Sequence, residues 1–180
     1  MSIKTDLSSY NNSWYDPGGN KLKRSFWFIA NAFFFASFNP FNGLKIALLR
    51  LFGAKVGHGV VIKPSVLIKY PWRLSIGNYV WIGEKVWIDN LENISIGNNV
   101  CISQGALLLC GNHDYKKATF DLMLEKITLE DGVWIGAKAI VCPGVTCASH
   151  SVLTVNSVAV KNLEPYSVYS GNPAIKVKDR

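Results

Sequence analysis

A six-residue periodicity runs from Val56 to Val158 and restricts what this chain can fold into. At one position of the repeat, thirteen of fourteen residues are Ile, Leu or Val, and four positions later comes a small or β-branched residue. The fourteen are Val56, Ile62, Ile68, Ile76, Ile82, Ile88, Ile96, Ile102, Leu108, Leu129, Ile135, Val141, Cys147 and Leu153. Side chains of an extended strand alternate between two faces, so the first and fifth positions share one face. The periodicity therefore predicts short strands that bury these two positions.

Glycine and asparagine residues between the expected strands can adopt positive φ and turn the chain through a corner. Three repeats then make one triangular coil, and stacked coils bury a continuous aliphatic column that no single coil could bury. We place the first three coils at 56–75, 76–95 and 96–113, the first two lengthened by two residues each, at Leu74–Ser75 and Ile94–Ser95. The sequence thus predicts an all-β fold, a parallel β-helix of about five coils.

The periodicity is interrupted once and then fades. Residues 114–128 are polar and charged, and we expect them to project as a loop before the repeat resumes at Leu129. The stretch Ser170–Ala174 is expected to leave the helix as a tail. We therefore divide the chain into an N-terminal irregular and helical cap, residues 1–55, and a β-helix domain with a C-terminal tail, residues 56–180.

Two apolar segments of the cap, residues 25–38 and 44–52, are expected to form short helices. The first is too short to span a bilayer as one helix. The end of a β-helix exposes an open core and an unpaired edge, which these helices would cover. A second interpretation is an interfacial anchor, with Trp27 and the Phe cluster facing lipid and the basic residues of Lys21–Arg24 facing headgroups. The two interpretations are compatible.

The charge pattern narrows the choice of partners. The net charge is +7, but no run of five basic residues occurs, which argues against nucleic acid as a partner.

The four cysteines, Cys101, Cys110, Cys142 and Cys147, form no CxxC pair and are interpreted as reduced thiols. The first twenty residues lack an apolar core, so no cleavable signal peptide is expected. We therefore predict a cytoplasmic protein, associated with the inner face of the membrane if the cap is also an anchor.

The residue before each buried position points outward. One outward face carries Val61, Trp81, Cys101, Trp134 and Val152, and a second carries Leu67, Trp87, Leu107, Ile140 and Val158. The third face is polar, with Arg73, Asn93, His113 and Thr146. Exposed tryptophan stripes of this extent are unusual on a monomer. We therefore expect a closed oligomer that buries both apolar stripes, and a cyclic trimer fits.

Several strings of the sequence are typical of one family. They are Tyr70-Pro71-Trp72-Arg73-Leu74, His113-Asp114, Val133-Trp134-Ile135-Gly136-Ala137, Pro143-Gly144-Val145-Thr146 and Gly171-Asn172-Pro173. On these strings nearly the whole chain resembles the hexapeptide-repeat acyltransferases, most closely the colanic acid and exopolysaccharide O-acetyltransferases. The resemblance implies a left-handed β-helix, a homotrimer, and transfer of an acetyl group from acetyl-CoA to a sugar hydroxyl in surface-glycan biosynthesis.

His113 is the expected general base. It is predicted to face outward at the corner where the periodicity breaks, and the resembled enzymes place a histidine at this break. A neutral imidazole can take the proton of a sugar hydroxyl while that hydroxyl attacks a thioester carbonyl. Asp114 follows it directly and is expected either to orient the imidazole or to remain a solvated loop charge.

The resemblance also assigns binding residues. Acetyl-CoA is expected in a groove between subunits, in contact with Trp134, Gly136, Ala137, Val155, Asn156, Lys161, Asn172 and Pro173. A backbone N–H near Ala137 would stabilise the oxyanion, and Asp89 and Asn90 would contact the sugar acceptor, which can be lipid-linked. The tail arginine of the family is Ile175 here, with Lys176 beside it. The acceptor sugar, its hydroxyl and the length of the acyl group stay open.

Two other functions compete with acetyl transfer. A γ-class carbonic anhydrase has the same fold with three zinc-binding histidines, and this chain contains His58, His113 and His150. The first and last are separated by four coil spacings, roughly 19 Å, so one subunit cannot bring all three to one zinc ion. We therefore expect no metal. A non-catalytic β-helix scaffold is the other alternative, and it predicts no CoA binding and no effect of changing His113.

Overall fold

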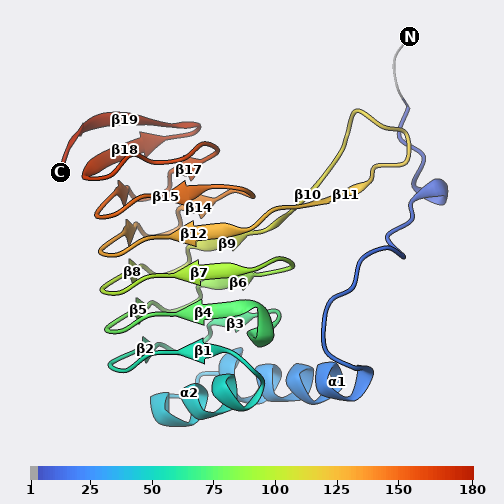
Figure 1. Cartoon of the computed structure of the whole chain (residues 1–180), viewed down its shortest axis with the longest axis horizontal. Helices are drawn as coiled ribbons and strands as arrows, with labels where there is room; N and C mark the ends of the chain where they lie inside the picture. The colour runs from blue at the N-terminus through green and yellow to red at the C-terminus, as the bar shows by residue number, and fades with distance from the viewer. Residues whose placement is uncertain (1–3) are drawn as a thin grey trace.

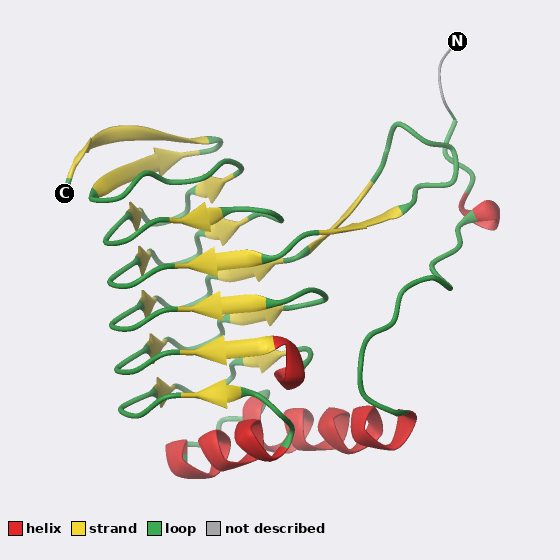
Figure 2. Cartoon of the chain, viewed as in Figure 1, coloured by secondary structure: helices red, strands yellow, loops and turns green. Residues whose placement is uncertain are grey.

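The computed structural model describes residues 4–180, which form a column of short parallel strands on a helical base (Figures 1 and 2). The first sheet contains β1 (Lys55–Val56), β4 (Leu74–Ile76), β7 (Ile94–Ile96), β12 (Ile127–Leu129) and β15 (Thr146–Cys147). The second contains β2 (Val61–Ile62), β5 (Trp81–Ile82), β8 (Cys101–Ile102), β13 (Trp134–Ile135), β16 (Val152–Leu153), β18 (Ser167–Gly171) and β19 (Ala174–Asp179). The third contains β3 (Leu67–Ile68), β6 (Trp87–Asp89), β9 (Leu107–Leu109), β14 (Ile140–Val141) and β17 (Val158–Ala159).

The chain visits the three sheets in turn and climbs as it goes. In Figure 1 it runs from right to left along the front sheet and returns behind it, so the coil is left-handed. We call the turn from the first to the second sheet the first corner, the turn from the second to the third sheet the second corner, and the turn from the third back to the first sheet the third corner. Equivalent turns of successive coils stack above one another, because the strands that precede them pair in register.

The stacking register buries the predicted ladder. Ile76 pairs with Ile96, and Ile82 with Ile102, so each repeat residue lies directly above its equivalent. Of the fourteen ladder positions thirteen are buried, and Val56 in the lowest coil is half-buried. The positions four residues later, from Val60 to Ser157, are buried as well. The predicted β-helix and its core are therefore confirmed.

Two details of the predicted register are wrong at the third corner. Leu74 and Ile94 are buried strand residues, so the two extra residues of these coils lie earlier, where Pro71–Arg73 form a 3-10 turn. The polar outward residues of the first sheet are consequently Ser75, Ser95 and Thr128 next to Thr146, not Arg73, Asn93 and His113. The face remains polar, because hydroxyl side chains replace the predicted ones.

The interruption of the periodicity is a β-hairpin that projects from the third corner (Figure 1). β10 (Gly111–His113) pairs antiparallel with β11 (Leu122–Leu124). Ile127 is already buried in β12, where it pairs with Ile94. The projecting segment was therefore predicted in the right place, but it begins three residues before 114 and ends before Ile127.

The C-terminal tail does not leave the helix. β18 adds a further strand above β16, and β19 folds back on β18 as an antiparallel partner. The turn between them contains Asn172 and a cis Pro173. This last hairpin covers the upper end of the core, where Tyr169 is buried above Leu153.

Helices close the lower end, as the cap interpretation predicts (Figure 2). After a 3-10 turn at Leu7–Ser9 the chain forms α1 (Lys21–Ala30), a π-helical turn (Asn31–Phe35) and α2 (Asn42–Leu51). Asn20 caps α1 by accepting from Lys23 N at 2.8 Å. Phe35 and Leu49 are fully buried in the cluster that continues the β-helix core.

Side chains of the cap also replace hydrogen bonds of a missing coil. Within the column an N–H of each coil donates to the coil above, as Lys63 N donates to Ile82 O at 2.9 Å. Carbonyls of the lowest coil have no coil beneath them and need other donors. The donors are Asn42 Nδ2 to Val60 O at 2.9 Å, Trp27 Nε1 to Ile68 O at 3.0 Å, Lys45 Nζ to Ile62 O at 3.2 Å and Arg50 Nη2 to Val56 O at 2.8 Å.

Trp27 is therefore a structural residue and not a lipid-facing one, since its side chain is buried between Phe35 and Phe52. Other aromatic residues of the cap are exposed: Phe26, Phe28, Phe33, Phe38 and Phe41. Within residues 4–180, each helix is too short or too polar to cross a bilayer. The cap thus presents an exposed aromatic surface without a spanning segment.

Candidate active site

The projecting hairpin holds His113 in one orientation. Its imidazole stacks on Phe120, with ring centroids 4.4 Å apart and planes 6° apart, and Tyr10 lies 5.7 Å away across a tilted contact. Nδ1 lies 2.9 Å from Phe120 O, so Nδ1 carries the hydrogen that this carbonyl accepts. In that tautomer Nε2 has a free lone pair and can accept a proton.

Asp114 closes the tip of the same hairpin. Its backbone N–H donates to Asp121 O at 2.8 Å, and its Oδ1 accepts from Lys116 N at 3.0 Å. Lys117 Nζ lies 4.0 Å from Asp114 Oδ2. No hydrogen bond of the described residues joins the Asp114 carboxylate to the imidazole of His113. The contacts therefore give Asp114 a part in shaping the loop that carries His113.

A groove of about 440 Å³ lies at the second corner, in the upper half of the column. It is lined by four of the predicted CoA contacts, Trp134, Gly136, Ala137 and Val155. Trp134 is fixed over it by a hydrogen bond from Nε1 to Ser103 Oγ at 3.0 Å. The groove also contains Ser103, Gln104, Val152 and Thr154, which the sequence analysis missed. Their repeat positions, within two residues of the ladder residues Ile102 and Leu153, could have indicated them.

The backbone at this corner leaves donors for a ligand. Gly136 N donates to Leu153 O and Lys138 N to Gln104 O, whereas no hydrogen bond of the described residues takes up the N–H of Ala137. The N–H of Val155, one coil higher, is equally unused. Buried or half-buried backbone donors seek a partner. Asn156 contributes through its backbone, since its N–H donates to Ala137 O at 2.8 Å.

Close packing of the coils requires a glycine at position 136, independently of any ligand. A Cβ at this position would lie 2.6 Å from Thr154 C and Val155 N of the coil above, which is a clash. Gly83, two coil spacings lower in the column, shows the same crowding, since a Cβ there would lie 2.6 Å from Gln104 N. Glycine is therefore required for close stacking of coils at the second corner, whether or not a ligand approaches it.

The remaining predicted CoA residues divide between two corners. Asn172 and Pro173 follow β18 at the second corner, directly above the turn of Thr154 and Val155. Gly171 N donates to Ser157 Oγ at 3.0 Å and attaches this turn to the coil below. Lys161 follows β17 and is exposed at the third corner, the corner of His113. Lys176 is engaged by Glu164 and Asp179 at 3.0 and 2.9 Å.

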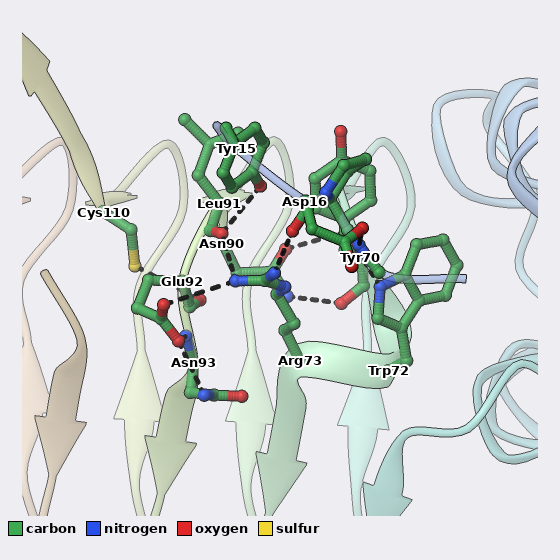
Figure 3. A network of polar contacts seen from close by, with 12 residues as sticks. Tyr15, Asp16, Tyr70, Trp72, Arg73, Asn90, Leu91, Glu92, Asn93 and Cys110 are labelled. Atoms are coloured by element: carbon green, nitrogen blue, oxygen red, sulfur yellow. Dashed lines mark hydrogen bonds and ion pairs between the residues drawn. The ribbon is translucent and has the colours of Figure 1, made fainter. Parts of the chain in front are cut away.

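The predicted acceptor residues lie at the third corner, where Asp89 pairs with Leu109 of the coil above. Figure 3 shows Asn90 among the polar contacts of this corner. Asp89 is 6% exposed, and its Oδ1 lies 2.9 Å from Lys69 Nζ, a contact of opposite charges without hydrogen-bond alignment. Asn90 is fully buried, accepts from Tyr70 N at 2.9 Å and donates to Tyr70 O at 2.5 Å. Both ends of the Asn90 amide therefore hold two coils together, and its contact with the acceptor stays a prediction.

Two other kinds of site, a cysteine nucleophile and a metal ion held by histidines, do not fit the arrangement of these side chains. Burial raises the pKa of the Cys110 thiol to about 12, so it is a poor thiolate nucleophile at neutral pH. His58 packs edge-on against Tyr79 and His150 stacks on Tyr166, each at the first corner. The three histidines lie apart, and within residues 4–180 no group of three His, Cys, Asp or Glu side chains could hold a metal ion.

In a single chain, His113 and the second-corner groove are therefore not brought together. They lie at the two ends of the third sheet, on different corners of the triangular column (Figure 1). General base catalysis needs the base within hydrogen-bond reach of the reacting hydroxyl.

Comparisons with known proteins bear on this geometry. No protein-family model matches the sequence. WcaF of Escherichia coli (strain K12), whose name describes a colanic acid biosynthesis acetyltransferase, is 38% identical over 176 residues, 97% of this chain and 97% of that protein. A hexapeptide-repeat acetyltransferase of Vibrio cholerae, solved with acetyl coenzyme A, has a TM-score of 0.79 at 24% identity over 88% of this chain and 87% of that one. A galactoside acetyltransferase in complex with coenzyme A has a TM-score of 0.78 at 22% identity over 88% and 80%. The two structures share the fold.

Proposed function

This chain belongs to the hexapeptide-repeat acetyltransferases, in the group that contains WcaF, and from that membership we propose its reaction. It transfers the acetyl group of acetyl-CoA to a sugar hydroxyl in the biosynthesis of an exopolysaccharide or another surface glycan. The observation that carries the proposal is the 38% identity to WcaF over almost the entire length of both proteins. Solved proteins of the same fold that hold acetyl coenzyme A or coenzyme A support the donor.

His113 is the proposed general base. Nε2 takes the proton of the sugar hydroxyl while the hydroxyl oxygen attacks the thioester carbonyl carbon, and the Ala137 N–H stabilises the oxyanion that forms. When the C–S bond breaks, the proton on Nε2 goes to the departing thiolate. The fixed Nδ1–H to Phe120 contact supports this role, because it keeps the basic nitrogen free. Asp114 is the proposed supporting residue, through the shape of the hairpin tip.

The proposed assembly is a homotrimer in which a neighbouring copy brings its second-corner groove to the hairpin of His113. Two observations support it: the two groups lie on different corners of one chain, and Trp81, Trp87 and Trp134 are each nearly half exposed. Trp134, Gly136, Ala137, Val155 and Asn156 would bind the pantetheine arm. Lys161 is proposed to reach the nucleotide phosphates, and Asn172 and Pro173 the adenine.

We also propose a contact site for the acceptor sugar and a contact of the helical cap with the membrane. Asp89 is proposed to contact the acceptor sugar, and the exposed aromatic residues of the cap to rest on the membrane interface. Aromatic rings next to basic residues are typical of interfacial helices, and α1 carries Lys21, Lys23 and Arg24 in its first turns. A lipid-linked sugar would then be reached without leaving the membrane surface.

The experiment that tests the reaction is a thiol-release assay. Purified protein is mixed with acetyl-CoA and a panel of free, nucleotide-linked and lipid-linked sugars, and free CoA is followed over time. Acetyl transfer predicts CoA release that depends on the acceptor and a product heavier by one acetyl group. A non-catalytic scaffold predicts no release with any acceptor and no CoA binding by calorimetry, which would overturn the proposal.

A further inference from the structure

The segment before α1 crosses the third corner and is attached to it. Tyr15 Oη donates to Leu91 O at 2.8 Å, Trp72 Nε1 donates to Pro17 O at 2.8 Å, and the Arg73 guanidinium donates to Asp16 O (Figure 3). Nearer the N-terminus, Asp6 N donates to Ala118 O of the projecting hairpin at 2.8 Å. This N-terminal strap, residues 4–20, therefore runs from the tip of the projecting hairpin to the start of α1 (Figure 1).

A pocket of about 460 Å³ lies between the strap and the third corner. Tyr10 and Leu122 are among its lining residues, and both neighbour His113: Tyr10 by a ring contact and Leu122 as its strand partner. The lower part of the pocket is formed by Arg24, Lys69 and Tyr70. The pocket thus leads from the hairpin of His113 downward to a pair of basic side chains.

A second hollow, of about 680 Å³, lies along α1 on the same side of the molecule. It shares the lining residues Arg24, Lys69 and Tyr70 with the first, so the two hollows are adjacent. Beyond these residues it is lined by Lys21 and by Phe28 and Ile29, whose side chains are 74% and 51% exposed. We call the combined path, from Tyr10 to Phe28, the acceptor groove.

The acceptor groove changes its chemistry along its length. Its upper part is polar, its middle is basic, and its lower part is apolar and opens on the exposed aromatic residues of the cap. Lys69 is partly neutralised by Asp89, but no ion pair of the described residues involves Lys21 or Arg24. Asn31 also borders the lower part, and its Oδ1 is buried without a hydrogen-bond partner among residues 4–180.

From this order of surfaces we propose that the groove binds a sugar joined through phosphate to a lipid chain. The sugar lies beside His113, the phosphate lies between Arg24 and Lys21, and the beginning of the lipid chain lies along Phe28 and Ile29. The guanidinium fork of Arg24 suits phosphate oxygens, and an unpaired basic residue at a membrane surface favours an anionic lipid group. This inference rests on the proposed function, because it names the class of acceptor for the same site.

The test measures binding and is independent of acetyl transfer. The full-length protein is sedimented with neutral phosphatidylcholine vesicles that contain either polyprenyl phosphate or phosphatidylglycerol at the same surface charge. We expect polyprenyl phosphate vesicles to bind at least about tenfold more tightly than the matched phosphatidylglycerol vesicles. The double variant Lys21→Glu, Arg24→Glu should lose roughly tenfold or more of that affinity, whereas Lys178→Glu, a reversal at the opposite end of the column, should lose little.

A second pair of variants separates the groove from general membrane contact. Phe28→Ser changes an aromatic residue in the groove, and Leu51→Ser changes an exposed apolar residue at the end of α2 outside it. Selective loss in Phe28→Ser supports the groove. Equal affinity for the two anionic vesicles, or equal losses in the two serine variants, would show a plain membrane contact and overturn the proposal. If binding behaves as expected but the thiol-release assay is silent, the proposed reaction fails and the groove remains.

Discussion

At the scale of single residues, the hydrogen bond from His113 Nδ1 to Phe120 O decides which nitrogen can act as a base. The stacked ring of Phe120 limits rotation of the imidazole, so the free Nε2 keeps one direction. Because the partner is a backbone carbonyl, substitution of Phe120 alone would not remove the hydrogen bond. The fold of the hairpin as a whole thus positions the imidazole of His113, the proposed base.

His113→Ala should lower kcat by about 10²–10⁴-fold, since general base catalysis contributes that much. Assembly mass and CoA affinity should stay near wild type, because neither the ladder nor the second-corner groove changes. His150→Ala, which removes a ring stacked on Tyr166, is the matched control and should keep its activity. More than about a third of the wild-type kcat in His113→Ala would contradict the assignment.

A second prediction at this scale concerns Cys147, which is fully buried at a ladder position. Burial raises the pKa of its thiol to about 12, whereas an unfolded cysteine has a pKa of about 8.5. The neutral thiol therefore stabilises the folded state below about pH 8.5, and that contribution is lost as the pH rises towards 12. Urea unfolding between pH 8 and 10.5 should show the free energy of unfolding falling less steeply in Cys147→Val, by up to about 1.4 kcal/mol per pH unit. Identical slopes in both proteins would refute the prediction.

At the scale of elements, the cap does for the lowest coil what each coil does for the one above it. Donors from Trp27 of α1 and from Asn42 and Lys45 of α2 reach carbonyls that would otherwise face an empty end of the column. A buried carbonyl that loses its donor costs about 1–3 kcal/mol. The cap is therefore part of the hydrogen-bond ladder as well as a hydrophobic cover.

Trp27→Phe should lower the free energy of unfolding by about 1–3 kcal/mol, because the ring stays but the donor to Ile68 O is lost. Chemical denaturation followed by circular dichroism measures the change. Trp14→Phe, at an exposed position 60% open to solvent, is the control and should change stability by no more than about 0.5 kcal/mol. If the two variants are equally stable, the hydrogen bond contributes nothing to the attachment of the cap.

At the scale of the whole molecule, the exposed tryptophans and the divided site point to the same assembly. Trp81, Trp87 and Trp134 stand on the outer sides of the second and third sheets, and Trp134 also lines the groove at the second corner. An apolar surface of this kind is explained if copies of the chain cover each other, as the proposed trimer requires.

Light scattering should therefore give three times the chain mass of 19.9 kDa. Trp87→Glu should dissociate the trimer or make the protein insoluble, because a buried charge without a partner costs several kcal/mol. Trp14→Glu places the same charge on the strap and should leave the mass unchanged. A monodisperse wild-type monomer at micromolar concentration would exclude a site shared between subunits.

Much of this molecule was predictable because its repeat is local. The ladder from Ile62 to Leu153 and the small residues four positions later were identified correctly, since alternation of side chains along a strand needs no distant partner. The groove residues named at the second corner came from the family resemblance and not from the repeat, and that resemblance did not name Ser103, Gln104 or Thr154. At the third corner the prediction was weaker: Arg73 and Asn93 were placed on the outer face of the first sheet, whereas the extra residues lie in the turns before the buried strand residues Leu74 and Ile94.

The sequence by itself determined the coil, its core and the corner at which the hairpin leaves, because each depends on spacings of six residues. Tertiary structure alone decided the surroundings of His113. Tyr15 reaches Leu91 across 76 residues, and the strap then brings Tyr10 to the imidazole. It also decided that Asn90 and Trp27 are buried and donate to backbone carbonyls of the column. Such contacts join segments with no common period, so only the balance of burial and hydrogen bonding in the folded chain selects them.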